Sequence, residues 1–181
     1  MRARSSMVGL LATMALSQSA DPLPYFTLES SGAVSLAVTS GEARYGIVPD
    51  PRGGRPVLSI SLGATKAEGS LSLFTDGEAA LRPGRYRVSS SLPEQPTAER
   101  WFHPCFVAGT VERPRGFFHG ESGWVTITSV EQGRITGEYR IRARGFLAPD
   151  LADENQWVTI RGTFSAEGES ETASAGGGSS S

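Results

Sequence analysis

The chain of 181 residues contains only one cysteine, Cys105, and only one lysine, Lys66. A single cysteine excludes a disulfide within the chain, so the fold must rely on packing or Cys105 must bond to another molecule. Beyond residue 20 no segment shows a helical period of apolar residues, and no glycine-rich loop for phosphate groups is present. These absences argue against a disulfide framework, a helical fold and a nucleotide-binding fold.

Basic residues are also too few for a nucleic-acid-binding protein. The chain has 17 Lys and Arg against 19 Asp and Glu. Loss of residues 1–20 would remove Arg2 and Arg4 and no acid, which leaves 15 basic against 19 acidic residues and a net charge of −4. Nucleic-acid affinity depends on clustered cations that neutralise phosphates. We therefore expect no nucleic-acid partner.

Residues 1–20 have the layout of a secretory signal peptide. Arg2 and Arg4 precede an apolar run over residues 7–16, and a small polar run follows at residues 17–20. The apolar run is too short to span a bilayer. A soluble amphipathic first helix is the alternative, but the polar residues cluster at the two ends instead of along one face. We predict export to the periplasm or the extracellular space, with no transmembrane segment after signal removal.

The chain after the signal peptide is predicted to be all-β. Apolar and polar side chains alternate over short segments, the pattern of strands with one buried face. The clearest segments are 34–38, 58–62, 86–88, 125–127, 135–143 and 158–166. We predict a single antiparallel β-sandwich, or a partly closed barrel, of about eight to ten strands over residues 21–166. Residues 167–181 are rich in glycine and serine and predict a disordered tail.

The most regular stretch, residues 123–145, predicts a β-hairpin. Ile135, Tyr139 and Ile141 alternate with polar residues, and Gly133 can take the left-handed conformation that a hairpin loop usually requires. The segment over residues 157–168 is the expected third strand beside this hairpin. The polar face of these three strands indicates a sheet that packs on one side only.

Four residues are candidate metal ligands: His103, Cys105, His119 and Glu121. His103 and Cys105 are two residues apart, as are His119 and Glu121, so each pair would project from one face of an extended segment. A turn over residues 110–115 would bring the two pairs together, and these donors suit zinc or another transition metal ion. The alternative is that an odd register separates the pairs, that Cys105 only fills space, and that the histidines lie at the surface.

Other polar groups have weaker signals. Arg140, Arg142 and Arg144 predict an outward cationic row, which either keeps the sheet soluble or binds an anion. A sugar-binding platform or caps on the core are the two interpretations of Trp101, Trp124 and Trp157. The acidic loop with Asp150, Asp153 and Glu154 lacks the spacing of a calcium loop. In "GESGW", Trp124 stands where a serine nucleophile elbow requires glycine, so no serine hydrolase is predicted.

Three motifs lie between residues 81 and 166. They are a Pro-Gly-x-Tyr strand start in "LRPGRYRV", a Gly-x-Val-x-Ile-Thr hairpin in "GWVTITSVEQGRITGEYRIRA" and a closing Gly-x-Phe strand in "WVTIRGTFSA". Together they resemble the carboxy-terminal half of exported bacterial β-sandwich domains of the lipoprotein type. The resemblance implies export and an all-β fold and brings no catalytic residues. The chain lacks the lipid-acceptor cysteine of the lipoprotein version, so the resemblance does not extend to membrane anchoring.

These observations predict an exported, non-enzymatic protein without a cofactor. We expect a structural or binding module of the cell envelope or extracellular space, whose ligand is a protein, a glycan or a small molecule held by loops at one end of the fold. The alternative is a metal-binding protein or metal-dependent enzyme that uses His103, Cys105, His119 and Glu121. A carrier of an apolar ligand is a third possibility, and it would require an enclosed cavity.

Overall fold

The computed structural model describes residues 25–39, 41–49, 55–63, 69–91, 99–110, 113–148 and 155–168. The predicted signal peptide, residues 1–20, lies outside these residues, as does the acidic loop with Asp150, Asp153 and Glu154. Of the predicted tail, only residues 167 and 168 are described, and they continue a strand. Folded structure therefore extends two residues beyond the predicted domain boundary.

All regular structure in the described residues is β-strand, which confirms the predicted all-β class. The described residues form eleven strands, against the predicted eight to ten, because short strands near the amino terminus add to the long ones. They are β1 (Tyr25–Phe26), β2 (Leu28–Gly32), β3 (Leu36–Val38), β4 (Glu42–Val48), β5 (Val57–Gly63), β6 (Gly69–Asp76), β7 (Gly84–Val88), β8 (Trp101–Gly109), β9 (Pro114–Glu131), β10 (Arg134–Leu147) and β11 (Gln156–Gly168).

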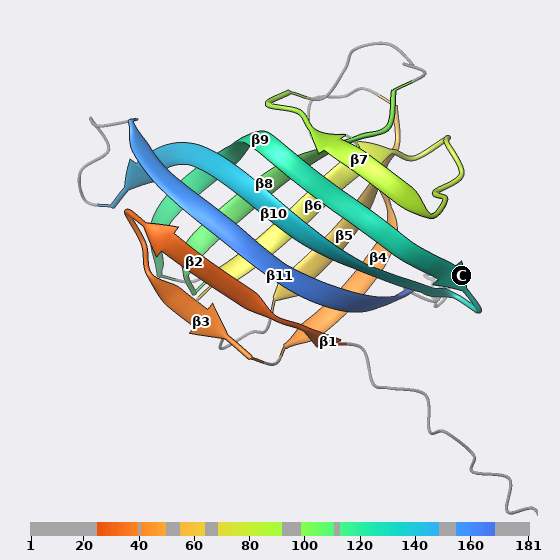
Figure 1. Cartoon of the computed structure of the whole chain (residues 1–181), viewed down its shortest axis with the longest axis horizontal. Coiled ribbons are helices and arrows are strands. Elements are labelled where there is room, and N and C mark those ends of the chain that lie inside the picture. The colour runs from red at the N-terminus through yellow and green to blue at the C-terminus, as the bar shows by residue number, and fades with distance from the viewer. Residues whose placement is uncertain are drawn as a thin grey trace, which may run out of the picture.

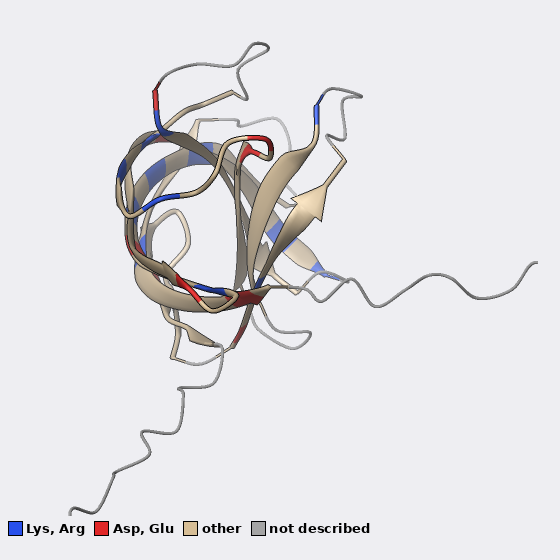
Figure 2. Ribbon diagram, turned by 90° about the vertical axis from the view of Figure 1, so that its right-hand side faces the viewer, with Lys and Arg blue, Asp and Glu red and all other residues tan. Residues whose placement is uncertain are grey.

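The eleven strands belong to one strongly curved sheet (Figure 1). Backbone pairing leads from β4 through β5, β6, β8, β9 and β10 to β11, and the end of β11 pairs with β4 again. Figure 2 shows the strands bent around a common interior. The strand β7 is inserted where β8 and β9 diverge, and the hairpin of β2 and β3 extends the sheet beside β11.

The sheet is mixed, although the sequence predicted antiparallel strands alone. Two short pairings are parallel, namely β7 with β8 and the end of β11 with β4. The pairing of β7 with β8 is limited to the end of β7, where Arg87 and Val88 lie beside Trp101 and Phe102 at the start of β8. The parallel contact of β11 arises because Glu167 and Gly168 extend past β1 and meet Arg44 and Tyr45.

Apolar side chains fill the concave side of the sheet. Along β10 every second residue is buried, and Ile135, Tyr139 and Ile141 are each at most 1% exposed, as predicted. The largest fully buried side chains form one cluster contributed by strands from all round the sheet: Phe26, Phe102, Phe106, Phe118, Tyr139 and Phe164. Burial of this apolar surface is the main source of stability, since the chain has no intrachain disulfide.

The predicted hairpin is confirmed. Glu131 pairs with Arg134, and the two loop residues Gln132 and Gly133 have φ values of 49° and 75°. Positive φ at both positions is typical of a tight turn that matches the twist of the two strands. Strand β11 pairs with β10 over twelve residues, from Arg134 with Glu167 to Gly145 with Gln156. The strands β9, β10 and β11 thus form the three-stranded wall that the sequence predicts.

One contact ties the amino-terminal strands to this wall. The Tyr139 hydroxyl on β10 crosses β11 at Gly162 and donates a hydrogen bond of 2.8 Å to the backbone carbonyl of Thr27. A Cβ atom at position 162 would lie 1.9 Å from the same carbonyl oxygen, so the close approach requires glycine. The short linker between β1 and β2 is therefore fixed against β10 and β11 through a side chain from the core.

Candidate functional site

The strand register places two candidate metal ligands directly opposite each other. Cys105 on β8 pairs with His119 on β9. Phe106, next to Cys105, and Phe118, next to His119, both point into the core, so Cys105 and His119 project together from the convex face of the sheet. His103 lies two residues before Cys105 and shares that face. This pairing of β8 with β9 is the register that brings the three side chains together.

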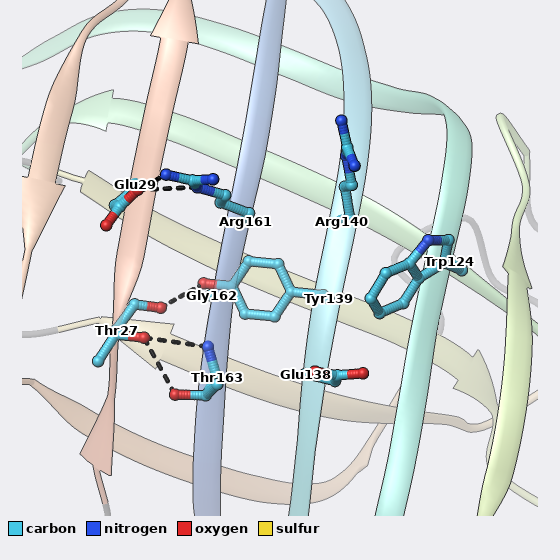
Figure 3. Close-up of a pocket in the computed structure, with 9 residues that line it drawn as sticks. All are labelled: Thr27, Glu29, Trp124, Glu138, Tyr139, Arg140, Arg161, Gly162 and Thr163. Atoms are coloured by element: carbon cyan, nitrogen blue, oxygen red, sulfur yellow. Dashed lines mark hydrogen bonds and ion pairs between the residues drawn. The ribbon is translucent and has the colours of Figure 1, made fainter.

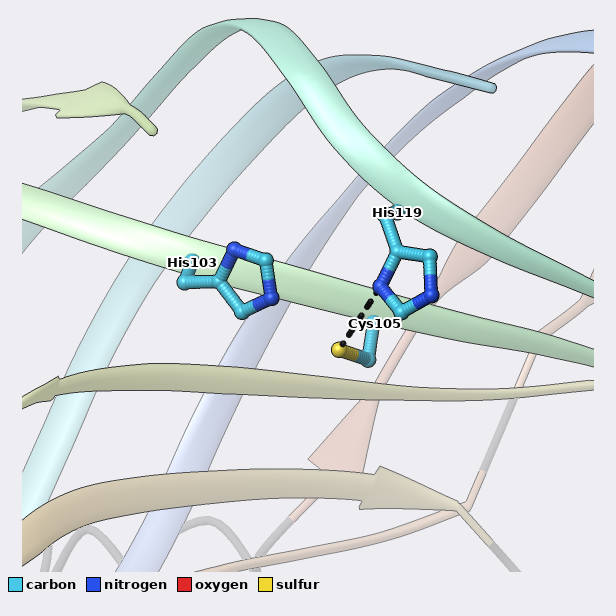
Figure 4. Close-up of side chains that lie close together, drawn as sticks. All are labelled: His103, Cys105 and His119. Carbon is cyan, nitrogen blue, oxygen red and sulfur yellow. Dashed lines mark hydrogen bonds between the residues drawn. The ribbon is translucent and has the colours of Figure 1, made fainter. Parts of the chain in front are cut away.

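The three side chains are close together (Figure 4). The Cys105 Sγ atom lies 3.6 Å from the His119 Nδ1 atom. The imidazole rings of His103 and His119 are nearly parallel, with an interplanar angle of 20° and centroids 5.8 Å apart. One potential ligand atom from each residue lies within 4.8 Å of the other two. His103 and Cys105 are half-buried and His119 is exposed, so the group lies at the surface.

The His103 ring is oriented by the backbone of the residue that follows β7. Its Nδ1 atom lies 3.0 Å from the Ser89 carbonyl oxygen. A carbonyl oxygen can only accept a hydrogen bond, so Nδ1 carries the proton, and in the neutral ring the lone pair is on Nε2. Ser89 is itself fixed, because its N–H donates a bond of 2.8 Å to the Phe102 carbonyl. No feature of the sequence predicted this role for Ser89.

The environment of Cys105 keeps its thiol protonated at neutral pH. Desolvation by burial raises the pKa of Cys105 to about 11. The contact of 3.6 Å between the neutral thiol and His119 Nδ1 is a weak hydrogen bond. The structure therefore holds the Cys105 donor in its protonated, uncharged form.

Glu121 does not belong to this group, although the sequence spacing paired it with His119. Its carboxylate lies 3.6 Å from the Nε atom of Arg144 on β10. The cause is a register irregularity, since Ser122 pairs with Arg142 and Gly120 pairs with Ala143, which leaves Glu121 without an opposite residue. This bulge turns Glu121 toward β10 and away from β8. The expected set of four ligands is thus reduced to three.

A second candidate site lies on the convex face of β9, β10 and β11. Trp124 pairs with Arg140, Arg140 with Arg161, and Arg161 with Glu29 on β2. These side chains form one row across four strands (Figure 3). They line a cleft of about 300 Å³ together with Thr27, Glu138, Tyr139, Gly162 and Thr163. The pairing of Arg140 with Arg161 follows from the register, which the sequence alone did not fix.

The cations of this face have different partners. Arg161 is paired with Glu29, with 2.8 Å between Nε and Oε2. Arg142 lies over the Trp157 ring at 4.2 Å, and Arg85 lies over the Trp124 ring at 5.1 Å, both in cation–π geometry. Within the described parts of the chain, Arg140 makes no ion pair. Arg140 therefore differs from Arg161 in having no carboxylate partner among the described residues.

The three tryptophans do not form one platform. Trp101 is 9% exposed and belongs to the buried apolar residues, which fits the interpretation of a cap on the core. Trp124 and Trp157 lie beside Arg140 and Arg144, respectively. Arg140 and Arg144 are four positions apart on β10, which is about 13 Å along a strand. Only Trp124 lines the cleft.

No helix among the residues that the structure describes is long and apolar enough to cross a membrane. Comparisons with protein-family models, with curated proteins and with solved structures give no match. The function therefore has to be inferred from the two sites themselves.

Proposed function

We propose that the chain is an exported, non-enzymatic binding protein that uses a closed β-barrel as a rigid scaffold and binds an acidic glycan on the outside. The proposal of a barrel is supported by the circuit of pairings that returns from β11 to β4 and by the curvature in Figure 2. A barrel of seven or eight strands has an interior that side chains can fill. Export is supported by the layout of residues 1–20.

The outside of the barrel is favoured over the inside because the interior holds a continuous apolar cluster. Phe102, Phe106 and Phe118 are each at most 1% exposed within it. These rings occupy the space that an apolar ligand would need, which argues against an apolar-ligand carrier. The sequence favoured binding by loops at one end of the fold, and this stays a prediction. Residues 92–98 and 149–154 lie outside the described residues.

The observation that carries the proposal is the position of Arg140 between Trp124 and the Arg161–Glu29 pair, at the edge of the cleft. A guanidinium binds a carboxylate with two parallel hydrogen bonds. The flat apolar ring of Trp124 lies next to this donor, as a sugar ring with a carboxylate substituent requires. Glu138 in the same cleft can accept hydrogen bonds from sugar hydroxyls. The matching ligand is an oligosaccharide that contains uronic acid.

Isothermal titration with an oligogalacturonate and with a neutral maltooligosaccharide of equal length tests this proposal. We expect heat of binding from the acidic sugar only, and a weaker affinity at higher salt. Arg140→Ala should abolish the signal, whereas Arg44→Ala should not, because Arg44 is an exposed arginine on β4 paired with Glu42. Equal binding of both sugars, or full binding by Arg140→Ala, would contradict the proposal.

A further inference from the structure

We propose that His103, Cys105 and His119 form a binding site for a zinc-like divalent metal ion. The site would lie on the convex face of β8 and β9, and it does not depend on the glycan-binding proposal. The inference concerns binding, and it assigns no reaction to the metal. Three protein donors would leave one position of a tetrahedral ion for water, on the solvent side where His119 is exposed.

The first support is composition. The whole chain has two histidines and one cysteine, and all three belong to this cluster. Two of them come from one strand and the third from the neighbouring strand, fourteen positions away from Cys105. Packing of the core gives no reason for these three residues to meet on the convex face, because none of them belongs to the apolar cluster. A shared ligand gives each of them a role.

The second support is distance. In zinc proteins the Zn–S bond is about 2.3 Å and the Zn–N bond about 2.0 Å, which places sulfur and nitrogen about 3.5 Å apart in a tetrahedral centre. The observed separation of Cys105 Sγ and His119 Nδ1 is 3.6 Å. The widest separation among the three donors, 4.8 Å, must shorten by about 1.3 Å to reach that value. Small rotations of these surface side chains can supply this movement.

The third support is the orientation of the His103 ring. The Ser89 carbonyl accepts the proton on Nδ1 and so presents the Nε2 lone pair as the donor. Figure 4 shows the second ring nitrogen of His103 on the side of the ring that faces Cys105 and His119. A hydrogen bond from the other ring nitrogen to a carbonyl is the usual way in which proteins orient a metal-binding histidine.

The donor types define the class of ion. One thiolate and two imidazoles suit Zn²⁺ and its spectroscopic substitute Co²⁺, and they disfavour Mg²⁺ and Ca²⁺, which prefer oxygen donors. On binding, the S–H bond of Cys105 breaks, its proton passes to solvent, and the metal–sulfur bond forms in its place. The two imidazoles bind as neutral groups. No oxidant or reductant takes part.

Titration of the full chain with Co²⁺, after reduction and removal of metals by a chelator, provides the test. We expect one Co²⁺ per chain, a thiolate-to-cobalt charge-transfer band, intense visible bands of tetrahedral cobalt, and loss of both signals when Zn²⁺ is added. Cys105→Ser should abolish the charge-transfer band. His103→Ala and His119→Ala should each weaken Zn²⁺ binding at least tenfold.

Glu121→Gln is the matched control. Glu121 is near in sequence but its carboxylate contacts Arg144, so this variant should bind Co²⁺ with the affinity and spectrum of the wild type. Folding of each variant is checked by its thermal midpoint without metal, and Zn²⁺ should raise that midpoint in the wild type but not in Cys105→Ser. A wild type without a charge-transfer band would overturn the proposal and leave the contact between Cys105 and His119 as a hydrogen bond only. Equal loss of binding in Glu121→Gln would overturn the assignment of the ligands.

Discussion

The hydrogen bond from Tyr139 to Thr27 provides a quantitative test of how the amino-terminal strands are held. Tyr139→Phe removes one hydroxyl and keeps the ring, which stacks on Phe164 with centroids 6.4 Å apart. The Thr27 carbonyl then loses its partner at 2.8 Å. A lost hydrogen bond of this kind costs about 1–2 kcal/mol of the free energy of unfolding. The thermal midpoint should fall by about 2–4 °C for each kcal/mol in a domain of this size.

Urea denaturation followed by intrinsic fluorescence measures this loss. The midpoint should move to lower urea while the slope stays constant, because the variant changes stability and not the surface exposed on unfolding. Tyr45→Phe is the matched control, since Tyr45 is half-buried on β4 and its hydroxyl has no hydrogen bond within the described residues. Its effect should stay within about 0.5 kcal/mol. Equal effects of the two variants would refute the assigned role of the Tyr139 hydroxyl.

Three further predictions concern Gly162, Phe106 and the ionisation of Tyr139. Gly162→Ala should cost about 1–3 kcal/mol, because its Cβ would lie 1.9 Å from the Thr27 carbonyl oxygen; Gly63→Ala, whose Cβ would meet only Ser70 at 3.1 Å or more, should cost less in the same urea titration. Phe106→Ala should cost about 3–5 kcal/mol by urea titration, since Phe106 is 1% exposed in the core. Burial raises the pKa of Tyr139 above its usual value, so its contribution to stability is complete below about pH 10 and falls at higher pH. Urea titrations from pH 8 to 11 should therefore show that the free energy of unfolding falls more steeply with pH in the wild type than in Tyr139→Phe. The same dependence on pH in both proteins would contradict this.

The sequence predicts side-chain burial well where the strands are long. Ile135, Tyr139 and Ile141 alternate with polar residues, and the pleat of a strand turns that alternation directly into a buried and an exposed face. The pairing of β10 with its two neighbours follows from proximity in the chain and from the turn at Gly133. These are local properties, so the sequence contains them.

Long-range pairing is not a local property, and here the sequence was insufficient. Nothing near Glu167 or Gly168 indicates that they meet Arg44 and Tyr45, yet this contact brings β11 back to β4. The insertion of β7 between β8 and β9 likewise depends on strands far apart in the chain. The prediction of a sandwich or barrel with antiparallel strands therefore gave the class of the fold and missed its mixed topology.

The candidate metal ligands show the same difference between local and long-range properties. The two-residue spacing of His103 and Cys105 was enough to place both on one face. Whether His119 and Glu121 joined them depended on the register and on a bulge in β9, which alternation does not reveal. The Ser89 carbonyl that orients His103 is a backbone group, and any residue at that position would present it.

Both candidate sites use side chains of the convex face. Binding residues on this face do not reduce the stability that the apolar interior provides. The interior of the sheet contributes most of the free energy of folding, so a polar ligand site there would leave buried polar groups and reduce the apolar surface that is removed from water. Arg140 and Cys105 project outward, and neither belongs to the buried apolar cluster. Substitutions at these two positions should therefore change the urea midpoint little while they remove binding. A large loss of stability in Arg140→Ala or Cys105→Ser would show that these residues serve the fold, and it would weaken the case for either site.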